Sequence, residues 1–159
     1  MRALVPLFLI LVATACGAPG ASSEAHEMSA SANLAANAAW AAPTPAGVDV
    51  AAGYMTITNP TNTADHLISA TSPRAERVEV HEMSMDGAVM RMRHVERPEI
   101  PAHGEMRLGP GGNHLMFFGV REPFAQGQEI PVRLVFEHAG TIDVMLPVRR
   151  TAPANHNAH

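Results

Sequence analysis

Short runs in which apolar and polar residues alternate dominate the chain between residues 46 and 149. The run at 53–59 (GYMTITN) alternates with period two and ends at Asn59-Pro60, a turn signal. Similar runs, separated by turns rich in glycine, are 77–85, 88–93, 105–108, 114–120, 130–137 and 141–148. No apolar spacing in this region predicts a long amphipathic helix. The pattern therefore predicts a single all-β domain, a β-sandwich.

The first sixteen residues predict an export signal. Arg2 precedes a short apolar run at 4–12, which is too short to span a bilayer as a permanent helix. The sequence Ala13-Thr14-Ala15-Cys16 resembles a bacterial lipobox, in which Cys16 becomes the lipidated N-terminus and anchors the protein to a membrane. Simple cleavage at the Ala-x-Ala sequence is the alternative. Both interpretations predict an exported protein.

Composition divides the rest of the chain. Residues 17–38 are rich in Ala, Ser, Gly and Asn, which predicts a flexible tether. We expect the folded domain at 39–150 and a flexible, histidine-containing tail at 151–159. Cys16 is the only cysteine, so the mature chain forms no internal disulfide.

Charge and composition exclude several functions. The chain has 159 residues, of which 47% are hydrophobic and 16% charged, as a folded domain requires, and its formal net charge is −4. All 11 basic residues are arginine, and no basic stretch exceeds Arg149-Arg150, which argues against a nucleic-acid groove. No nucleophile–base pair, nucleotide loop or cofactor fingerprint is evident, so we expect no enzyme.

Histidine and methionine gather around one expected hairpin. Asp86-Gly87 is the preferred dipeptide of a two-residue type I′ turn, between the runs 77–85 and 88–93. With that turn, His81 lies opposite Met92 and Met83 lies opposite Met90. Because side chains alternate with period two, one face then holds His81, Met83, Met85, Ala88, Met90 and Met92. Arg91 and Arg93 fall on the other face.

A second pair of donors lies downstream, at His114 and Met116, which share one face of a strand. Together with the hairpin, they give the pattern His81-x10-Met92-x21-His114-x-Met116. Two imidazoles and two thioethers are neutral and include soft sulfur, which suits Cu(I) better than Zn²⁺, Ca²⁺ or Mg²⁺. No cysteine lies near these residues, which argues against a blue-copper electron carrier.

These residues resemble the PCu(A)C family of periplasmic copper chaperones, whose copper pattern is H-x10-M-x21-H-x-M. The resemblance covers about residues 38 to 148, including AAGYMTITNP at 51–60, VEVHEMSMDGAVMRMR at 78–93 and LGPGGNHLMFFGV at 108–120. It implies a cupredoxin-like Greek-key β-sandwich in the periplasm. It also implies that His81, Met92, His114 and Met116 bind one Cu(I). The acceptor that it implies is typically the CuA centre of cytochrome c oxidase, sometimes with a Sco-type partner.

Other interpretations of the histidines and methionines stay open. A copper-storage or resistance protein would bind several copper ions, and Met83, Met85 and Met90 are either packing or a thioether patch that helps to shield or transfer copper. His26 in the tether, with His156 and His159 in the tail, could bind Cu(II) weakly. We interpret His66, His94, His103 and His138 as structural or exposed. We expect a monomer.

Overall fold

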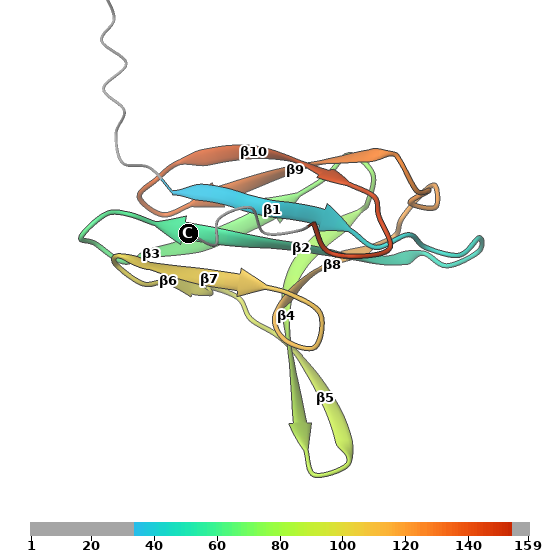
Figure 1. Ribbon diagram of the computed structural model, residues 1–159, viewed down its shortest axis with the longest axis horizontal. Coiled ribbons are helices and arrows are strands. Elements are labelled where there is room, and N and C mark those ends of the chain that lie inside the picture. The colour runs from blue at the N-terminus through green and yellow to red at the C-terminus, as the bar shows by residue number, and fades with distance from the viewer. Residues whose placement is uncertain (1–33, 154–159) are drawn as a thin grey trace, which may run out of the picture.

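A computed structural model describes residues 34–153, and within this range all regular secondary structure is β-strand. No helix in the described range is long and apolar enough to cross a membrane. Figure 1 shows the strands wrapped around one core, with a single hairpin extending from it. The strands are β1 (Ala35–Ala41), β2 (Val50–Asn59), β3 (Asp65–Thr71), β4 (Arg77–Asp86), β5 (Val89–His94), β6 (Glu99–Ile100), β7 (Gly104–Leu108), β8 (His114–Phe118), β9 (Glu129–Phe136) and β10 (Thr141–Pro147).

The alternating pattern produces the core directly. Along β2, buried and half-buried residues alternate without a break, and Met55 and Ile57 are fully buried. Along β9, Ile130, Val132 and Leu134 point inward in the same way. Because successive side chains of a strand point to opposite faces, each such strand covers the core with one half of its residues.

The strands form one curled sheet in the order β1-β2-β8-β4-β3-β9-β10. β5 extends the sheet beside β4, β6 pairs with β3, and β7 pairs with β2. The two ends of the order come together, since β1 packs against β10 and Ala41 bridges Val148. The result is a nearly closed sandwich with a non-sequential strand order, which confirms the predicted all-β, cupredoxin-like Greek-key class.

All seven alternating runs are strands, but three strands escaped the pattern. β1 begins at Ala35, inside the segment 17–38 that composition assigns to a tether, so the tether prediction is wrong for residues 35–38. These residues form a strand because β2 pairs with them and because Leu34, Trp40 and Ala41 are buried. β3 and the two-residue β6 were also not expected.

Several expectations lie outside the described range. They concern the signal and lipobox at 1–16, residues 17–33 with His26, and residues 154–159 with His156 and His159.

β4 and β5 form the predicted hairpin, but the register of their pairing differs from the expected one. Its two loop residues are Gly87 and Ala88, not Asp86 and Gly87, and Asp86 pairs with Val89. Gly87 has φ 63°, whereas Ala88 has no positive φ. A type I′ turn requires positive φ at both central residues, and a type II′ turn requires it at the first, which is where glycine stands here.

A buried polar corner supports the start of β3. The Asp65 carboxylate accepts hydrogen bonds from the backbone N–H groups of His66 at 2.7 Å, His138 at 3.0 Å and Ala139 at 2.8 Å. Burial of Asp65 raises the pKa of its carboxyl, but these hydrogen bonds outweigh burial and the pKa is lowered below the ordinary value. The ionised carboxylate therefore ties the 137–140 turn to the start of β3.

Candidate metal site

Three histidines lie side by side on adjacent strands. His81 of β4 lies directly opposite His114 of β8 and, on its other side, directly opposite His94 of β5. The ring centroids are 6.3 Å apart for His81 and His114, and 5.8 Å apart for His81 and His94. His81 stands where the protruding hairpin leaves the body of the sheet, so it joins the hairpin to the core.

Each of the two predicted histidine ligands has one ring nitrogen already engaged. His81 Nε2 lies 2.8 Å from Glu79 Oε2, and His114 Nδ1 lies 3.0 Å from the carbonyl oxygen of Gly112. Both partners are acceptors, so these nitrogens carry the proton and donate. The arrangement leaves His81 Nδ1 and His114 Nε2 as the free lone pairs. Metal-binding histidines usually donate their second N–H to a carboxylate or carbonyl in this way.

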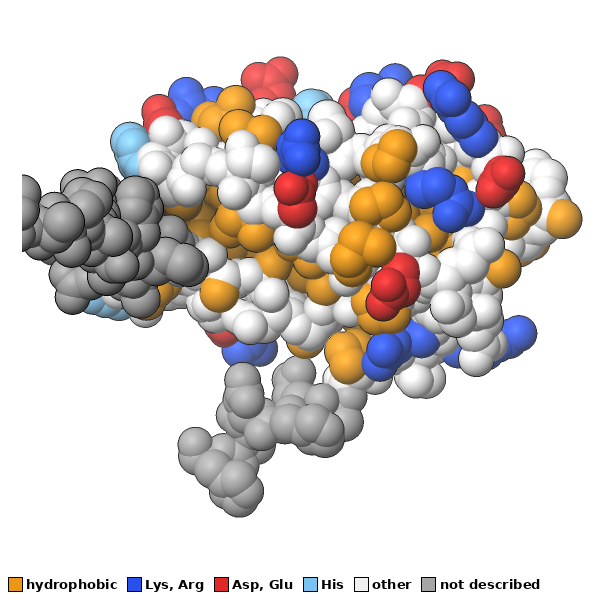
Figure 2. All heavy atoms as spheres, turned by 90° about the horizontal axis from the view of Figure 1, so that it is seen from above, with side chains coloured by type: hydrophobic (Ala, Val, Ile, Leu, Met, Phe, Trp, Pro, Cys, Tyr) orange, Lys and Arg blue, Asp and Glu red, His pale blue; other side chains and the backbone are white. Residues whose placement is uncertain are grey.

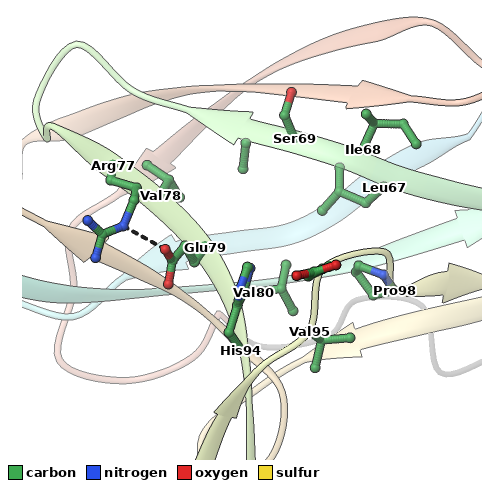
Figure 3. Close-up of a pocket in the computed structure, with 12 residues that line it drawn as sticks. Leu67, Ile68, Ser69, Arg77, Val78, Glu79, Val80, His94, Val95 and Pro98 are labelled. Atoms are coloured by element: carbon green, nitrogen blue, oxygen red, sulfur yellow. Dashed lines mark ion pairs between the residues drawn. The ribbon is translucent and has the colours of Figure 1, made fainter.

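Glu79 is held as an anion between two cationic or donor groups. The hydrogen bond from His81 is the largest cause that lowers the pKa of Glu79; burial opposes it, and the nearby charge of Arg77 adds to it. Arg77 Nε lies 2.6 Å from Glu79 Oε1. Figure 3 shows this ion pair at the edge of a hollow between β3 and β4, which His94 and Val80 also line. A fixed anion beside His81 favours the tautomer that exposes Nδ1.

A second hollow is lined by His114 of β8 and by sulfur donors. Met83, Met92 and Met116 line it together with His114, and the segment from Ala42 to Pro45 and Tyr54 form its wall. His114 is only 4% exposed, whereas Met92 is 48% exposed. The hollow is therefore built from a buried imidazole at its base and more accessible thioethers from β4, β5 and β8.

The four predicted ligands are thus brought into one region, with two differences from expectation. Met92 lies opposite Met83 rather than opposite His81, because the turn is displaced along the chain. His81 adjoins His114 but does not line the hollow, and Met83, which the sequence did not single out as a ligand, takes that place. The sequence does hold a signal for Met83. It lies two residues from both His81 and Met85, so it shares their face of the strand.

Two further expectations match the structure, namely the face of Arg91 and Arg93 and the exposure of His94. Arg91 and Arg93 point to the face opposite the methionines, where Arg91 Nη2 lies 3.0 Å from Asp86 Oδ2 and Arg93 Nε lies 2.6 Å from Glu82 Oε2. His94 is exposed, and His66 Nδ1 lies 3.1 Å from Glu137 Oε2. Among residues 34–153, no three His, Cys, Asp or Glu side chains cluster as metal ligands would. The donors that meet here are imidazole and thioether groups, which favour a soft cation such as Cu(I).

Comparison with protein families identifies the domain. A family model described as "Putative lipoprotein LpqE-like" matches residues 34–148, most of the chain and nearly all of the described range. The chain belongs to the LpqE-like family. A curated relative of this LpqE-like protein, "Putative lipoprotein Lxx21020" of Leifsonia xyli subsp. xyli, is 32% identical over 113 residues. The match spans 70% of this chain and 68% of that protein.

Solved structures share the fold of this LpqE-like domain. The copper-bound PCuAC domain from PmoF2 superposes with a TM-score of 0.64 at 22% identity, covering 75% of this chain and 94% of that one. The solution structure of CuI-DR1885 from Deinococcus radiodurans gives 0.58 at 26% identity, covering 80% of this chain and 87% of that one. The apo form of DR1885 gives 0.57 at 25% identity, with 95% and 97% covered. The predicted resemblance to the PCu(A)C family is confirmed.

Proposed function

We propose that this LpqE-like domain binds one Cu(I) and delivers it to another copper protein. Its predicted ligands are His81, Met92, His114 and Met116. The observation that carries the proposal is the meeting of His114, Met92 and Met116 around one hollow, with His81 directly across from His114. Structures named for bound copper share the fold, and one of them, at 26% identity, is named for Cu(I).

The free nitrogens support this assignment. His114 presents Nε2 and His81 presents Nδ1, because their other nitrogens donate to Gly112 and Glu79. Neutral imidazoles and thioethers add no charge to Cu(I), so the bound ion keeps its single positive charge. Thioethers also resist loss to disulfide formation in an oxidising compartment, where thiols would be consumed.

Transfer follows from the weakness of the thioether ligands. Met92 and Met116 come from different strands, so each can be replaced while the other donors still hold the ion. A thiolate of an acceptor binds soft Cu(I) more strongly than a thioether does, so copper moves toward a cysteine site by ligand exchange. The CuA domain of cytochrome c oxidase is the acceptor we propose to test, with a Sco-type protein as an alternative partner. A chaperone of this kind needs no catalytic group.

The family name supports export and membrane anchoring. Both the LpqE-like family and the Leifsonia relative are described as putative lipoproteins. We propose that Cys16 carries the lipid and holds the domain at the outer face of a membrane, in the periplasm. Metabolic labelling with a radioactive fatty acid tests this, since Cys16→Ser should abolish the label.

An anaerobic Cu(I) titration against a chromogenic Cu(I) chelator tests the site. The protein used in the titration carries the substitution Cys16→Ser, so that no thiol competes with the site for Cu(I). We expect one tightly held Cu(I), lost in the Met92→Leu/Met116→Leu variant, because leucine keeps the volume and removes the sulfur. Met145→Leu, at an exposed methionine of β10, is the control and should bind normally. Unchanged binding in the double variant would refute the assignment.

The stoichiometry separates this function from copper storage. The methionines of the hairpin supply more sulfur than one ion needs, which is the observation that favours storage or resistance. Binding of three or more tightly held Cu(I) ions per chain would support that alternative. One tight ion that passes to a CuA domain supports the chaperone.

A further inference from the structure

We infer that Met85 and Met90, at the tip of the β4–β5 hairpin, form a second Cu(I) site, which has two donors instead of four and so holds the ion more weakly than the inner site. This site captures the ion and passes it inward. The tip site stands on its own geometry, whereas the inward transfer rests on the function proposed above.

The register sets the two tip methionines side by side. Met85 lies directly opposite Met90, and the next pair on the same face is Met83 opposite Met92. Directly opposite residues have Cβ atoms about 4.5–5.5 Å apart. A methionine side chain has three rotatable bonds, so both sulfurs of a pair can reach one ion between them. Two soft sulfur donors favour Cu(I) over harder cations.

Packing does not account for the tip methionines. Met85 is 63% exposed and Met90 is 57% exposed, whereas Met55 and Met106 are buried in the core. Figure 1 shows the outer part of the hairpin standing clear of the body of the domain. Large apolar side chains held in water gain nothing from burial, so their place on one face of a protruding hairpin needs another reason.

The two faces of the hairpin are chemically distinct. The charged side chains, which are Glu82, Asp86, Arg91 and Arg93, alternate onto the face away from the methionines and pair with each other there. The methionine face therefore presents neutral sulfur donors with no arginine among them. A monovalent soft cation can approach this face without meeting a guanidinium group directly.

The methionine pairs form a graded path to the inner hollow. Adjacent pairs on one face are two residues apart along each strand, roughly 6.6 Å. Exposure falls along this path, from the tip pair to Met92 at 48% and then to His114 at 4%. Met83 and Met92 belong to both the path and the hollow, since they line the hollow with His114. Cu(I) exchanges one thioether for the next, so no change of oxidation state is needed.

NMR of the ¹³C-methyl-labelled methionines, with Ag(I) as a redox-inert probe and Cu(I) in parallel, tests the tip site. The protein is the chain with Cys16→Ser. We expect the first equivalent of metal to shift the Met92 and Met116 methyl signals and the second to shift those of Met85 and Met90. Met85→Leu/Met90→Leu should lose the second equivalent and keep the first.

Met145→Leu is the matched control, because Met145 is 50% exposed on β10 and faces no other methionine across the strand pair. Figure 2 shows a face of the molecule seen from above, on which apolar side chains lie among charged ones, so an exposed methionine outside the hairpin controls for exposure itself. Met145→Leu should still bind both equivalents of metal.

Two results would overturn the tip site: methyl signals of Met85 and Met90 that stay fixed in the presence of excess Ag(I), or a second equivalent retained by Met85→Leu/Met90→Leu. The inner site fails separately, if Met92 and Met116 do not shift. For the transfer step, stopped-flow loading of the inner site should slow in the tip variant while its affinity is unchanged. An unaltered loading rate would overturn the path and leave only the tip site.

Discussion

Met83 lies directly opposite Met92 across the β4–β5 hairpin, and both side chains line the hollow that holds His114. This pairing links the hairpin to the body of the sheet, since the next pair inward is His81 with His94 and the next strand contributes His114. A sulfur pair thus sits between the exposed tip and the buried imidazole.

The register of the hairpin can be tested by cross-linking in the chain with Cys16→Ser. Met83→Cys/Met92→Cys should oxidise to a disulfide, because directly opposite residues have Cα atoms about 4.5–5.5 Å apart, within the range of a disulfide. Met83→Cys/Met90→Cys should stay reduced, since these two residues are diagonal neighbours in this register. Thiol titration after mild oxidation measures both. The opposite outcome would restore the Asp86-Gly87 turn.

Glu79 should tune copper affinity through His81 without touching the metal. Its carboxylate accepts the hydrogen bond from His81 Nε2 at 2.8 Å and so fixes the ring with Nδ1 free. Removing such a partner typically costs about 10–100-fold in metal affinity. We expect Glu79→Ala to weaken Cu(I) binding by a factor in this range, as measured by chelator competition.

Glu82→Ala is the control for Glu79, because Glu82 is a carboxylate on the same strand whose partner is Arg93 on the opposite face. It should leave Cu(I) affinity unchanged. Wild-type affinity in Glu79→Ala would show that His81 is not a ligand held by Glu79. Equal losses in both variants would point to a general effect of charge instead.

Most strands could be predicted from the sequence because their burial alternates with period two, as in β2 and β9. The prediction missed strands in which that period is interrupted. β3 has a register shift between Leu67 and Ser69, and β1 has one between Asn37 and Trp40. β1 is also rich in alanine, which has little preference for strands, so only its pairing with β2 and its buried end reveal it.

The candidate site was predictable in outline and not in detail. Alternation places His81, Met83, Met85, Met90 and Met92 on one face for both two-residue turns, because the two registers differ by an even number of residues. The choice between Asp86-Gly87 and Gly87-Ala88 as loop residues depends on which residue has positive φ, and glycine satisfies both turn types at different positions. The contact between the hairpin and β8 depends on a strand order that local patterns do not encode.

Gly53 should be needed for the close packing of β2 against the core. A Cβ atom at this position would lie 2.8 Å from Leu146 Cδ2 and 2.8 Å from Phe117 Cε2, both in the core. Gly53→Ala therefore forces these side chains to move, and overpacking of this kind costs about 1–3 kcal/mol in the free energy of unfolding. Urea denaturation measures the loss.

Gly109→Ala is the matched control for Gly53, because a Cβ there meets no atom within 4 Å. It should change the free energy of unfolding by less than about 0.5 kcal/mol, as surface substitutions usually do. Similar losses in the two variants would refute the close approach of β2 to Leu146 and Phe117 as the cause, because the effect of Gly→Ala on the unfolded chain raises stability rather than lowering it.

Asp65 should make the stability of the domain fall in acid. Its carboxyl has a lowered pKa in the folded protein, since three backbone N–H groups donate to it and outweigh its burial. In the unfolded chain the pKa is about 3.9. Because the folded pKa is the lower one, the stabilisation is fully present above the unfolded pKa and is lost as pH falls through the folded pKa.

Asp65→Asn removes this dependence, because an amide does not ionise and presents one acceptor oxygen instead of two. At pH 7 it should lower the free energy of unfolding by about 1–3 kcal/mol, the cost of leaving a buried donor without its partner. The difference between wild type and variant should shrink steadily as pH falls below about 4, where the unfolded carboxyl of the wild type takes up its proton. Urea denaturation of both proteins from pH 7 to pH 3 measures it. A difference that stays constant across this range would show that Asp65 stabilises the turn by shape and not by charge.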